Sequence, residues 1–277
     1  MSAASPALPI GARRVARPPA ELGGLARIEG RRLIFHPVFL VGLALSLLYL
    51  RDSVRYHDLQ VFLGQWAFLP LAGGTLIAAN LAALRSRRDG TDELYGSLPH
   101  PRSSRIAGQL LGLAWTLPVS SAVMAAAYIA SGAPYTPAIV ELAQGPAMVV
   151  VSGTIGILLA RMAPSSIVGA LMIVAIYAAQ SQTWESPGSW GAWLLPMRND
   201  VAVGAGASIP CEPGAAVSGC GMVFVSVSGA TWHLGYLVGV TLLAGVAALV
   251  RGRRPLAFAA LAVMAALLAG ATKLAAG

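Results

Sequence analysis

Residues 85–105 read RSRRDGTDELYGSLPHPRSSR and lie between two long apolar runs. The stretch carries eight formal charges, five of them on arginine. Each charge costs about 2.5 to 3.5 kcal/mol at the centre of a bilayer, so leaving the stretch in lipid would cost on the order of 20 kcal/mol. The stretch must therefore lie outside the membrane, and its arginines indicate the cytoplasmic side.

The composition of the whole chain is that of a polytopic membrane protein. Of the 277 residues, 56% are hydrophobic and only 11% are charged, and the mean hydropathy is +0.70. Lys273 is the only lysine, and this preference for arginine indicates a GC-rich genome and a bacterial source. Despite the net charge of +8, we do not expect nucleic-acid binding, because the arginines flank apolar runs and are not interleaved with aromatic residues.

The amino-terminal residues divide into a tail and a short helix. Residues 1–20 are rich in Ala, Pro and Arg and lack an apolar core, which predicts a disordered cytoplasmic tail rather than a signal peptide. Residues 21–33 have an apolar face opposite a basic face, which predicts a helix along the inner membrane surface. The alternative is a polar lead-in to the first span, because Glu29 falls near the apolar face. The two faces consist of Leu22, Leu25, Ala26 and Leu33 on one side and Arg27 and Arg31 on the other.

Seven apolar runs are candidates for membrane helices, since about 18 apolar residues suffice to cross a bilayer. The fourth and fifth runs are separated only by Ala163 and Pro164, where we expect a tight hairpin because proline does not continue a helix. Residues 21–277 would then form one transmembrane domain. The predicted spans are 33–50, 62–84, 106–130, 142–162, 165–183, 232–250 and 255–274.

The distribution of basic residues sets the orientation. With the amino terminus in the cytoplasm, seven spans place fifteen basic residues inside and four outside, as the positive-inside rule requires. If the last run were not a span, the count would fall to six and Lys273 would move inside.

An external region is predicted at residues 182–231, too long to be only a connection. Its tryptophans, Trp184, Trp190 and Trp193, favour a short interfacial or re-entrant helix, and substrate gating is the alternative role. Cys211 and Cys220 also lie there, and an oxidising compartment would permit a disulfide between them; two free thiols or a metal site are the alternatives.

The sequence offers no catalytic constellation. It lacks the phosphate-binding loop of ATPases, the serine-hydrolase elbow and the zinc-binding H-E-x-x-H. The isolated histidines are expected at membrane interfaces, and the polar residues within spans are expected to be interhelical hydrogen-bond partners rather than parts of a transport path. Two G-x-x-x-G patterns, at Gly108 and at Gly235, predict close helix contacts. The histidines are His36, His57, His100 and His233, and the polar residues are Gln65, Asn80, Gln109, Gln144 and Glu141.

The stretch after Arg88 resembles the membrane subunits of ABC-2 type exporters. Those permeases carry G-T-x-E-L, then L-P, then basic residues, then I-x-x-G leading into the third span. The junction at His36-Pro37, preceded by a helix with Glu29, Arg31 and Arg32, is similar to the family's beginning. The matching residues of the loop are Gly90, Thr91, Glu93, Leu94, Leu98, Pro99, Arg102, Arg105, Ile106 and Gly108.

The resemblance implies an all-α fold, a polytopic helical bundle with a six-span permease core and an amino-terminal interfacial amphipathic helix, to which the apolar runs of this chain add a seventh C-terminal span. It also implies that the loop 85–105 forms a coupling helix that docks on a separate ATP-binding subunit. Asp92 and Glu93 would suit the first turn of that helix, and Pro99 would end it. The chain itself would hold no cofactor, because ATP would bind to the partner.

The expected protein is therefore a permease subunit in the plasma or inner membrane that forms a homodimer or a heterodimer and exports a substrate. Two other classes remain open. A passive channel would need no nucleotide, and an intramembrane enzyme acting on lipid would need acid, base or metal groups that the spans lack.

Overall fold

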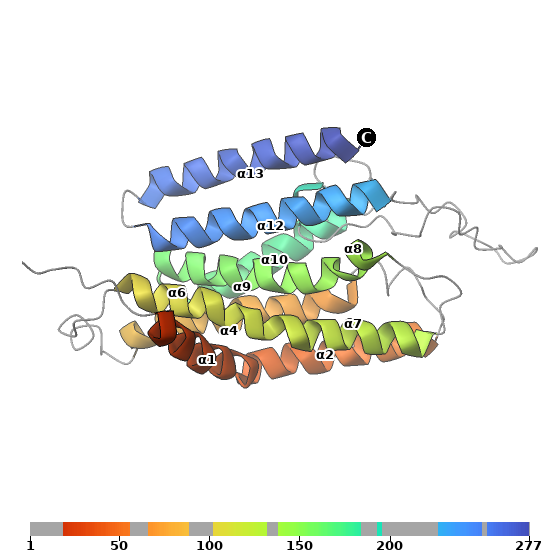
Figure 1. Ribbon diagram of the computed structural model, residues 1–277, viewed down its shortest axis with the longest axis horizontal. Helices are drawn as coiled ribbons and strands as arrows, with labels where there is room; N and C mark the ends of the chain where they lie inside the picture. Colours follow the sequence, from red (N-terminus) through yellow and green to blue (C-terminus); the bar gives the residue numbers. More distant parts are fainter. Residues whose placement is uncertain are drawn as a thin grey trace, which may run out of the picture.

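The computed structural model describes residues 19–55, 66–88, 102–131, 138–183, 193–195, 227–250 and 254–276, and these residues are almost entirely helical. The helices lie lengthwise in an elongated bundle (Figure 1). They are α1 (Pro19–Ile34), α2 (Pro37–Arg55), η1 (Trp66–Phe68), α4 (Leu69–Arg88), α6 (Arg102–Gly112), η2 (Leu113–Trp115), α7 (Thr116–Ser131), α8 (Ile139–Leu142), α9 (Gln144–Met162), α10 (Ser166–Thr183), α12 (Val227–Leu249) and α13 (Arg254–Ala276).

Three helical stretches are long and apolar enough to cross a membrane, namely Ser103–Ala126, Ile139–Met162 and Ser228–Leu249. A fourth candidate is the pair Leu22–Ile34 and Pro37–Arg51, which is bent by 57° at the break between them. The described part of the chain is therefore all-helical, with the long apolar helices of a membrane protein. Shorter apolar helices, Leu69–Arg85, Ser166–Ala179 and Ala262–Leu274, lie alongside these stretches.

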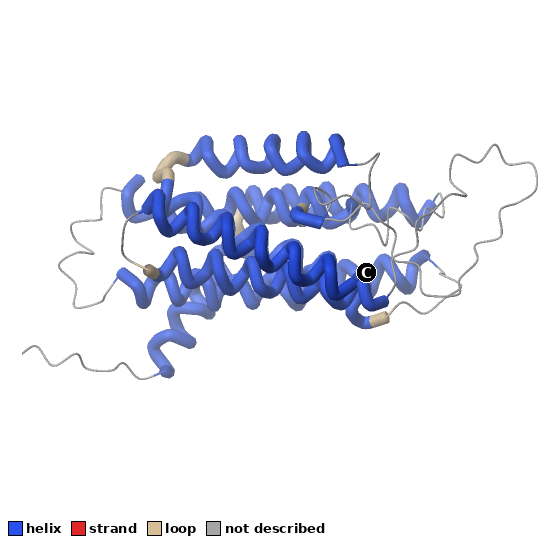
Figure 2. Tube along the Cα trace, turned by 90° about the horizontal axis from the view of Figure 1, so that it is seen from above, coloured by secondary structure: helices blue, strands red, loops and turns tan. Residues whose placement is uncertain are grey.

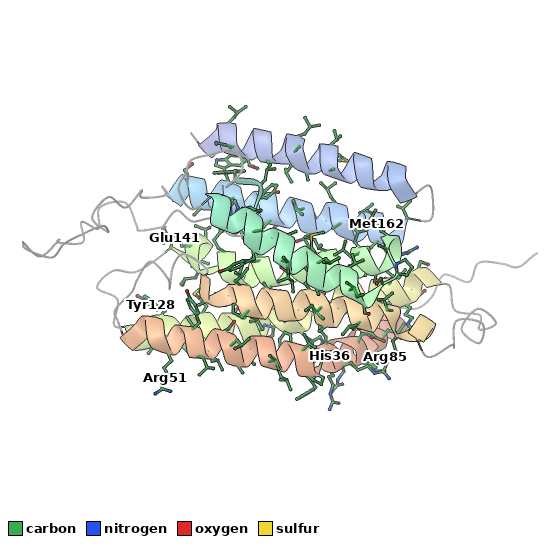
Figure 3. All side chains as sticks on the ribbon, turned by 180° about the vertical axis from the view of Figure 1, so that it is seen from behind. His36, Arg51, Arg85, Tyr128, Glu141 and Met162 are labelled. Carbon is green, nitrogen blue, oxygen red and sulfur yellow. The ribbon has the colours of Figure 1, made fainter. Side chains whose placement is uncertain are left out.

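The long helices run between two ends of the bundle, which Figure 3 identifies by labelled residues. His36, Arg85 and Met162 lie toward one end, called here the Arg85 end. Arg51, Tyr128 and Glu141 lie toward the other, called here the Glu141 end. The ends are the frame in which the candidate sites are placed.

At the centre of the bundle, α4 packs against α9, with α2 and α12 on either side. Helix α9 is buried almost throughout because its sequence, QGPAMVVVSGTIGILLARM, has small or apolar residues on every face. At the crossing of α2 and α4, Gly42 and Gly74 allow backbone contact, since a Cβ on Gly74 would meet Val38 O at 2.8 Å. Helix α13 lies outermost and packs on α12.

The helix bounds refine the predicted spans. The first predicted span, residues 33–50, starts too early, because Leu33 and Ile34 still belong to α1 and α2 begins at Pro37. Proline suits the first helical position, and His36 Nδ1 before it accepts a hydrogen bond from Val38 N at 3.3 Å.

Other boundaries shift less. The predicted hairpin at Ala163-Pro164 is confirmed, since α9 ends at Met162 and α10 begins at Ser166. The predicted third span is continuous but passes through the 3-10 turn η2. The described part of the second predicted span consists of η1 from Trp66 and α4 from Leu69, and residues 62–65 lie outside the described ranges.

Candidate functional site

The predicted coupling residues fall at the edge of what the structure describes. The ends of the loop 85–105 are helical, because Arg85 to Arg88 complete α4 and Arg102 to Arg105 begin α6. The remaining predicted residues lie outside the described ranges, so their roles stay predictions. These residues are Gly90, Thr91, Asp92, Glu93, Leu94, Leu98 and Pro99.

The two helix ends that flank this loop lie at the Arg85 end of the bundle (Figure 1). Arg102 and Arg105 occupy the first turn of α6, where no acidic residue is present. Positive charge at a helix amino terminus opposes the helix dipole. Arg102 and Arg105 are therefore not placed to stabilise α6 through its dipole.

Helix α1 is held closely against α6. A Cβ on Gly112 would meet Gly30 N at 2.9 Å, and a Cβ on Gly108 would meet Leu25 Cβ at 3.0 Å. The G-x-x-x-G pattern at Gly108 therefore makes the predicted close helix contact, and it does so within the chain. In the second pattern only one glycine makes a close helix contact. Gly239 contacts Leu268 of α13, whereas Gly235 faces open space.

The faces of α1 follow the predicted pattern. Leu33 is buried, whereas Arg27 and Arg31 are exposed. Glu29 turns toward the bundle, with a side chain only 10% exposed, and pairs with Arg32 at 3.4 Å. The predicted position of Glu29 near the apolar face is thus correct, and Arg32 offsets its charge. That α1 lies on a membrane surface stays a prediction.

A cluster of buried hydrogen bonds joins three helices at the Glu141 end. Gln144 Nε2 of α9 donates to Ala230 O of α12 at 2.7 Å, which fixes the amide so that its oxygen faces His233. His233 Nδ1 lies 2.9 Å from Gln144 Oε1 and His233 Nε2 lies 3.2 Å from Leu195 O. Because Gln144 Oε1 can only accept, Nδ1 carries a proton.

The turn Trp193–Leu195 is held against this cluster by hydrogen bonds at Trp193 and Leu194, and Leu195 O lies beside His233 Nε2. Trp193 Nε1 donates to Thr272 Oγ1 of α13 at 2.9 Å, and Tyr236 OH donates to Leu194 O at 2.8 Å. The Trp193 and His233 rings meet edge-on, with centroids 5.6 Å apart. The turn therefore connects α12 and α13.

These contacts place two predicted interfacial side chains inside the bundle. His233 is fully buried, so its ring faces other helices, and its depth in a membrane stays a prediction. Trp193 is only 5% exposed and does not anchor the chain at the headgroups. In both cases a hydrogen bond to a residue far away in the sequence offsets the free-energy cost of burying the polar ring atom. His57, His100, Trp184 and Trp190 lie outside the described residues.

Asn80, Gln109 and Gln144 bond to other helices, as expected, whereas Glu141 bonds within the described residues only to the start of its own helix. Asn80 Nδ2 of α4 donates to Gly156 O of α9 at 3.3 Å, and Gln109 Nε2 of α6 donates to Ala82 O of α4 at 3.4 Å. Glu141 Oε2 accepts from Ala138 N at 2.8 Å. Within the described residues, Glu141 Oε1 and Asn80 Oδ1 are buried without a hydrogen-bond partner.

Other site predictions are not tested or find no support. Gln65, Cys211 and Cys220 lie outside the described residues, so the disulfide stays a prediction. In the described ranges, no three His, Cys, Asp or Glu side chains gather to hold a metal ion. A cavity of about 20 Å³ between α4, α9 and α10 has room for about one water molecule.

Comparison with protein-family models, with curated proteins and with solved structures finds no significant match to this chain.

Proposed function

We propose that the chain is the membrane-spanning permease subunit of an ABC-2 type exporter in the plasma or inner membrane. It crosses the membrane seven times with a cytoplasmic amino terminus, so that the Arg85 end is cytoplasmic. The spans are α2, α4, α6 with α7, α8 with α9, α10, α12 and α13, and the last is additional to a six-span core. ATP hydrolysis takes place on a separate ATP-binding subunit, and two permease subunits, identical or different, enclose the path.

The ordered residues between α4 and α6 carry this proposal. Gly90, Thr91, Glu93 and Leu94, followed by Leu98 and Pro99, resemble the family's coupling loop in order and spacing. Positive charge alone would satisfy the topology of a cytoplasmic loop, but it would not produce this order. The flanking arginines add charge that can pair with an acidic partner surface.

The packing of α1 on α6 supports a mechanical link to the loop. The backbones approach at Gly30 and Gly112, with 2.9 Å from a Cβ on Gly112 to Gly30 N, and this contact would make α1 follow a displacement of α6. A force that acts on the loop 85–105 would reach α6 first and then α1. Through the bend at His36 it would also reach α2. Rocking of these helices would open the path toward the Glu141 end.

Copurification with the ATP-binding subunit tests the proposal. The tagged full chain is expressed in its native host, extracted in mild detergent and assayed for a copurifying ATP-binding protein and for ATPase activity. The charge reversals Glu93→Lys and Arg102→Glu should each lower partner retention about tenfold, which is the effect of losing about 1.4 kcal/mol at an interface.

The matched control is Arg51→Glu, an exposed arginine at the Glu141 end, which should retain the partner fully. All variants must insert and elute like the parent protein. If no ATPase copurifies, or if Glu93→Lys and Arg102→Glu retain it as well as Arg51→Glu does, the proposal fails and a nucleotide-independent channel becomes the better reading.

A further inference from the structure

One face of α1 is exposed along its whole described length. Arg27 and Ile28 are exposed together, then Arg31 and Arg32 one turn later, and Phe35 follows directly after the helix. Ile28 is 51% exposed and Phe35 is 65% exposed. These five residues are called the α1 stripe. Two large apolar side chains at the surface of an otherwise charged helix require an explanation.

The direction of the α1 stripe is fixed by the opposite face of the helix. Gly30 contacts the backbone of Gly112, with 2.9 Å from a Cβ on Gly30 to Gly112 O, and Leu25 contacts Gly108. Helix α1 therefore cannot rotate without losing this contact. Seen from above, the helix diverges from the bundle at the Arg85 end (Figure 2), in keeping with its 57° bend from α2.

The order of side chains within the α1 stripe is that of a lipid interface. Ile28 and Phe35 are seven residues apart and so lie on the same side of the helix, two turns apart. Arg27 and Arg31 flank them on one side and Arg32 on the other. Apolar side chains between arginines enter the boundary between headgroups and acyl chains, while the guanidinium groups reach the phosphates.

The charges of the stripe are not equivalent. Arg32 Nη1 lies 3.4 Å from Glu29 Oε1, so part of its charge is already balanced within the helix. Arg27 and Arg31 lie on the other flank, and neither forms an ion pair with another described residue. Trp115, 38% exposed, lies against Gly30 and adds an aromatic ring of the kind found at membrane interfaces.

We propose that the α1 stripe is a binding surface for anionic phospholipids. Arg27 and Arg31 bind the lipid phosphates and the extra negative charge of the headgroup, and Ile28 and Phe35 insert beside the acyl chains. An acidic protein surface would pair with the arginines but would offer no apolar contact to Ile28 and Phe35, whereas a lipid offers both. The inference does not rest on the proposed transport function.

Lipid retention by the purified full chain tests the proposal. The protein is exchanged into detergent micelles that contain equal amounts of phosphatidylglycerol and phosphatidylcholine, and the lipids that remain bound after gel filtration are measured by mass spectrometry. The parent protein should retain phosphatidylglycerol preferentially. Arg27→Gln combined with Arg31→Gln should lower the ratio of the two lipids by about fivefold for each arginine, as expected for a basic side chain near an anionic surface.

Two controls separate charge from apolar contact. Arg51→Gln, an exposed arginine at the other end of the bundle, should leave the ratio unchanged. Ile28→Ser combined with Phe35→Ser should lower retention of both lipids without changing their ratio. All four side chains of the α1 stripe that are replaced are exposed, so these variants should elute as the parent does.

The proposal is overturned if the parent shows no preference for phosphatidylglycerol, or if Arg51→Gln lowers the ratio as much as the double arginine variant. It is also overturned if the double variant keeps its lipids but loses a bound acidic protein, since the stripe would then be a protein-docking surface. Failure to copurify an ATPase would leave the lipid result intact, so the two proposals fail separately.

Discussion

At the Arg85 end, α1 is held to α6 by close approach of two backbones, whereas at the Glu141 end α9, α12 and α13 are joined by side-chain hydrogen bonds. The first contact requires that Gly30 and Gly112 have no Cβ, because a Cβ at either position would meet the backbone of the other helix. The arginines of α1 lie on the face away from this contact and are exposed. The second depends on polar atoms of Gln144 and His233 that are buried among apolar residues. The first contact should therefore be broken by adding atoms and the second by removing them.

The largest effect is expected from Gly112→Val. A Cβ there would lie 2.9 Å from Gly30 N and 3.3 Å from Ala26 O, both backbone atoms that cannot rotate away. Overpacking of this kind costs about 1 to 3 kcal/mol. Thermal unfolding in detergent should show a lower midpoint for the variant.

Gly235→Val is the matched control, because Gly235 belongs to the other G-x-x-x-G pattern and a Cβ there would meet nothing within 4 Å. Equal stability of Gly112→Val and Gly235→Val would show that the α1 contact is not tightly packed.

The second effect is a coupling between Gln144 and His233. In a double-mutant cycle of Gln144→Leu and His233→Phe, the coupling free energy should be about 0.6 to 1.7 kcal/mol, the range found for interhelical hydrogen bonds in membrane proteins. Unfolding in mixed micelles gives the four free energies of unfolding. Gln109→Leu serves for comparison and should cost less, because Gln109 makes one longer bond of 3.4 Å to Ala82 O. A coupling near zero would mean that the pair does not join α9 to α12.

The helices could be predicted from the sequence because lipid imposes a simple rule on composition and length. The break at Ala163-Pro164 follows from proline, and the charged flanks of the long loop follow from the cost of burying arginine. The bend at His36 and the start of α2 at Pro37 also follow from the proline, although the predicted first span, residues 33–50, begins before it.

The partners of buried polar groups could not be predicted, because each bond joins residues far apart in the sequence. Gln144 and His233 are 89 positions apart, and Trp193 and Thr272 are 79 apart. Only the spacing of His233 and Tyr236, which places two polar aromatic residues on one side of α12, gave a local signal. A coupling role for the loop 85–105 stays a prediction that rests on resemblance, since its charges alone indicate no more than its side of the membrane.

A smaller effect is expected from Thr272→Val, which keeps the shape of the side chain and removes the acceptor of the Trp193 Nε1 bond. The loss should be about 0.5 to 1.5 kcal/mol, as for a typical hydrogen bond, and it should appear in the unfolding midpoint. Thr241→Val is the control, because Thr241 Oγ1 donates to Leu237 O of its own helix. If both variants unfold alike, the turn Trp193–Leu195 does not contribute to the stability of α13.

The smallest effect concerns the pH dependence of the Arg85 end. His36 lies in the break between α1 and α2, outside both helices, and its Nδ1 accepts a hydrogen bond from Val38 N. Burial and, secondarily, the nearby Arg85 guanidinium lower the pKa of His36 below its ordinary value of 6.5. Protonation would also remove the acceptor that caps α2.

Because the pKa is lower in the folded protein, the unfolded chain binds the proton first and stability falls as the pH drops below about 6.5. His36→Asn keeps a capping acceptor but does not titrate, so its unfolding midpoint should change less between pH 7.5 and pH 5 than that of the parent. Arg85→Gln should raise the pKa of folded His36 toward its ordinary value and so make the loss of stability smaller without abolishing it, since burial remains the larger cause. If all three proteins lost stability in parallel, His36 would not be the titrating group, and the acid sensitivity of the bundle would have to arise at other residues.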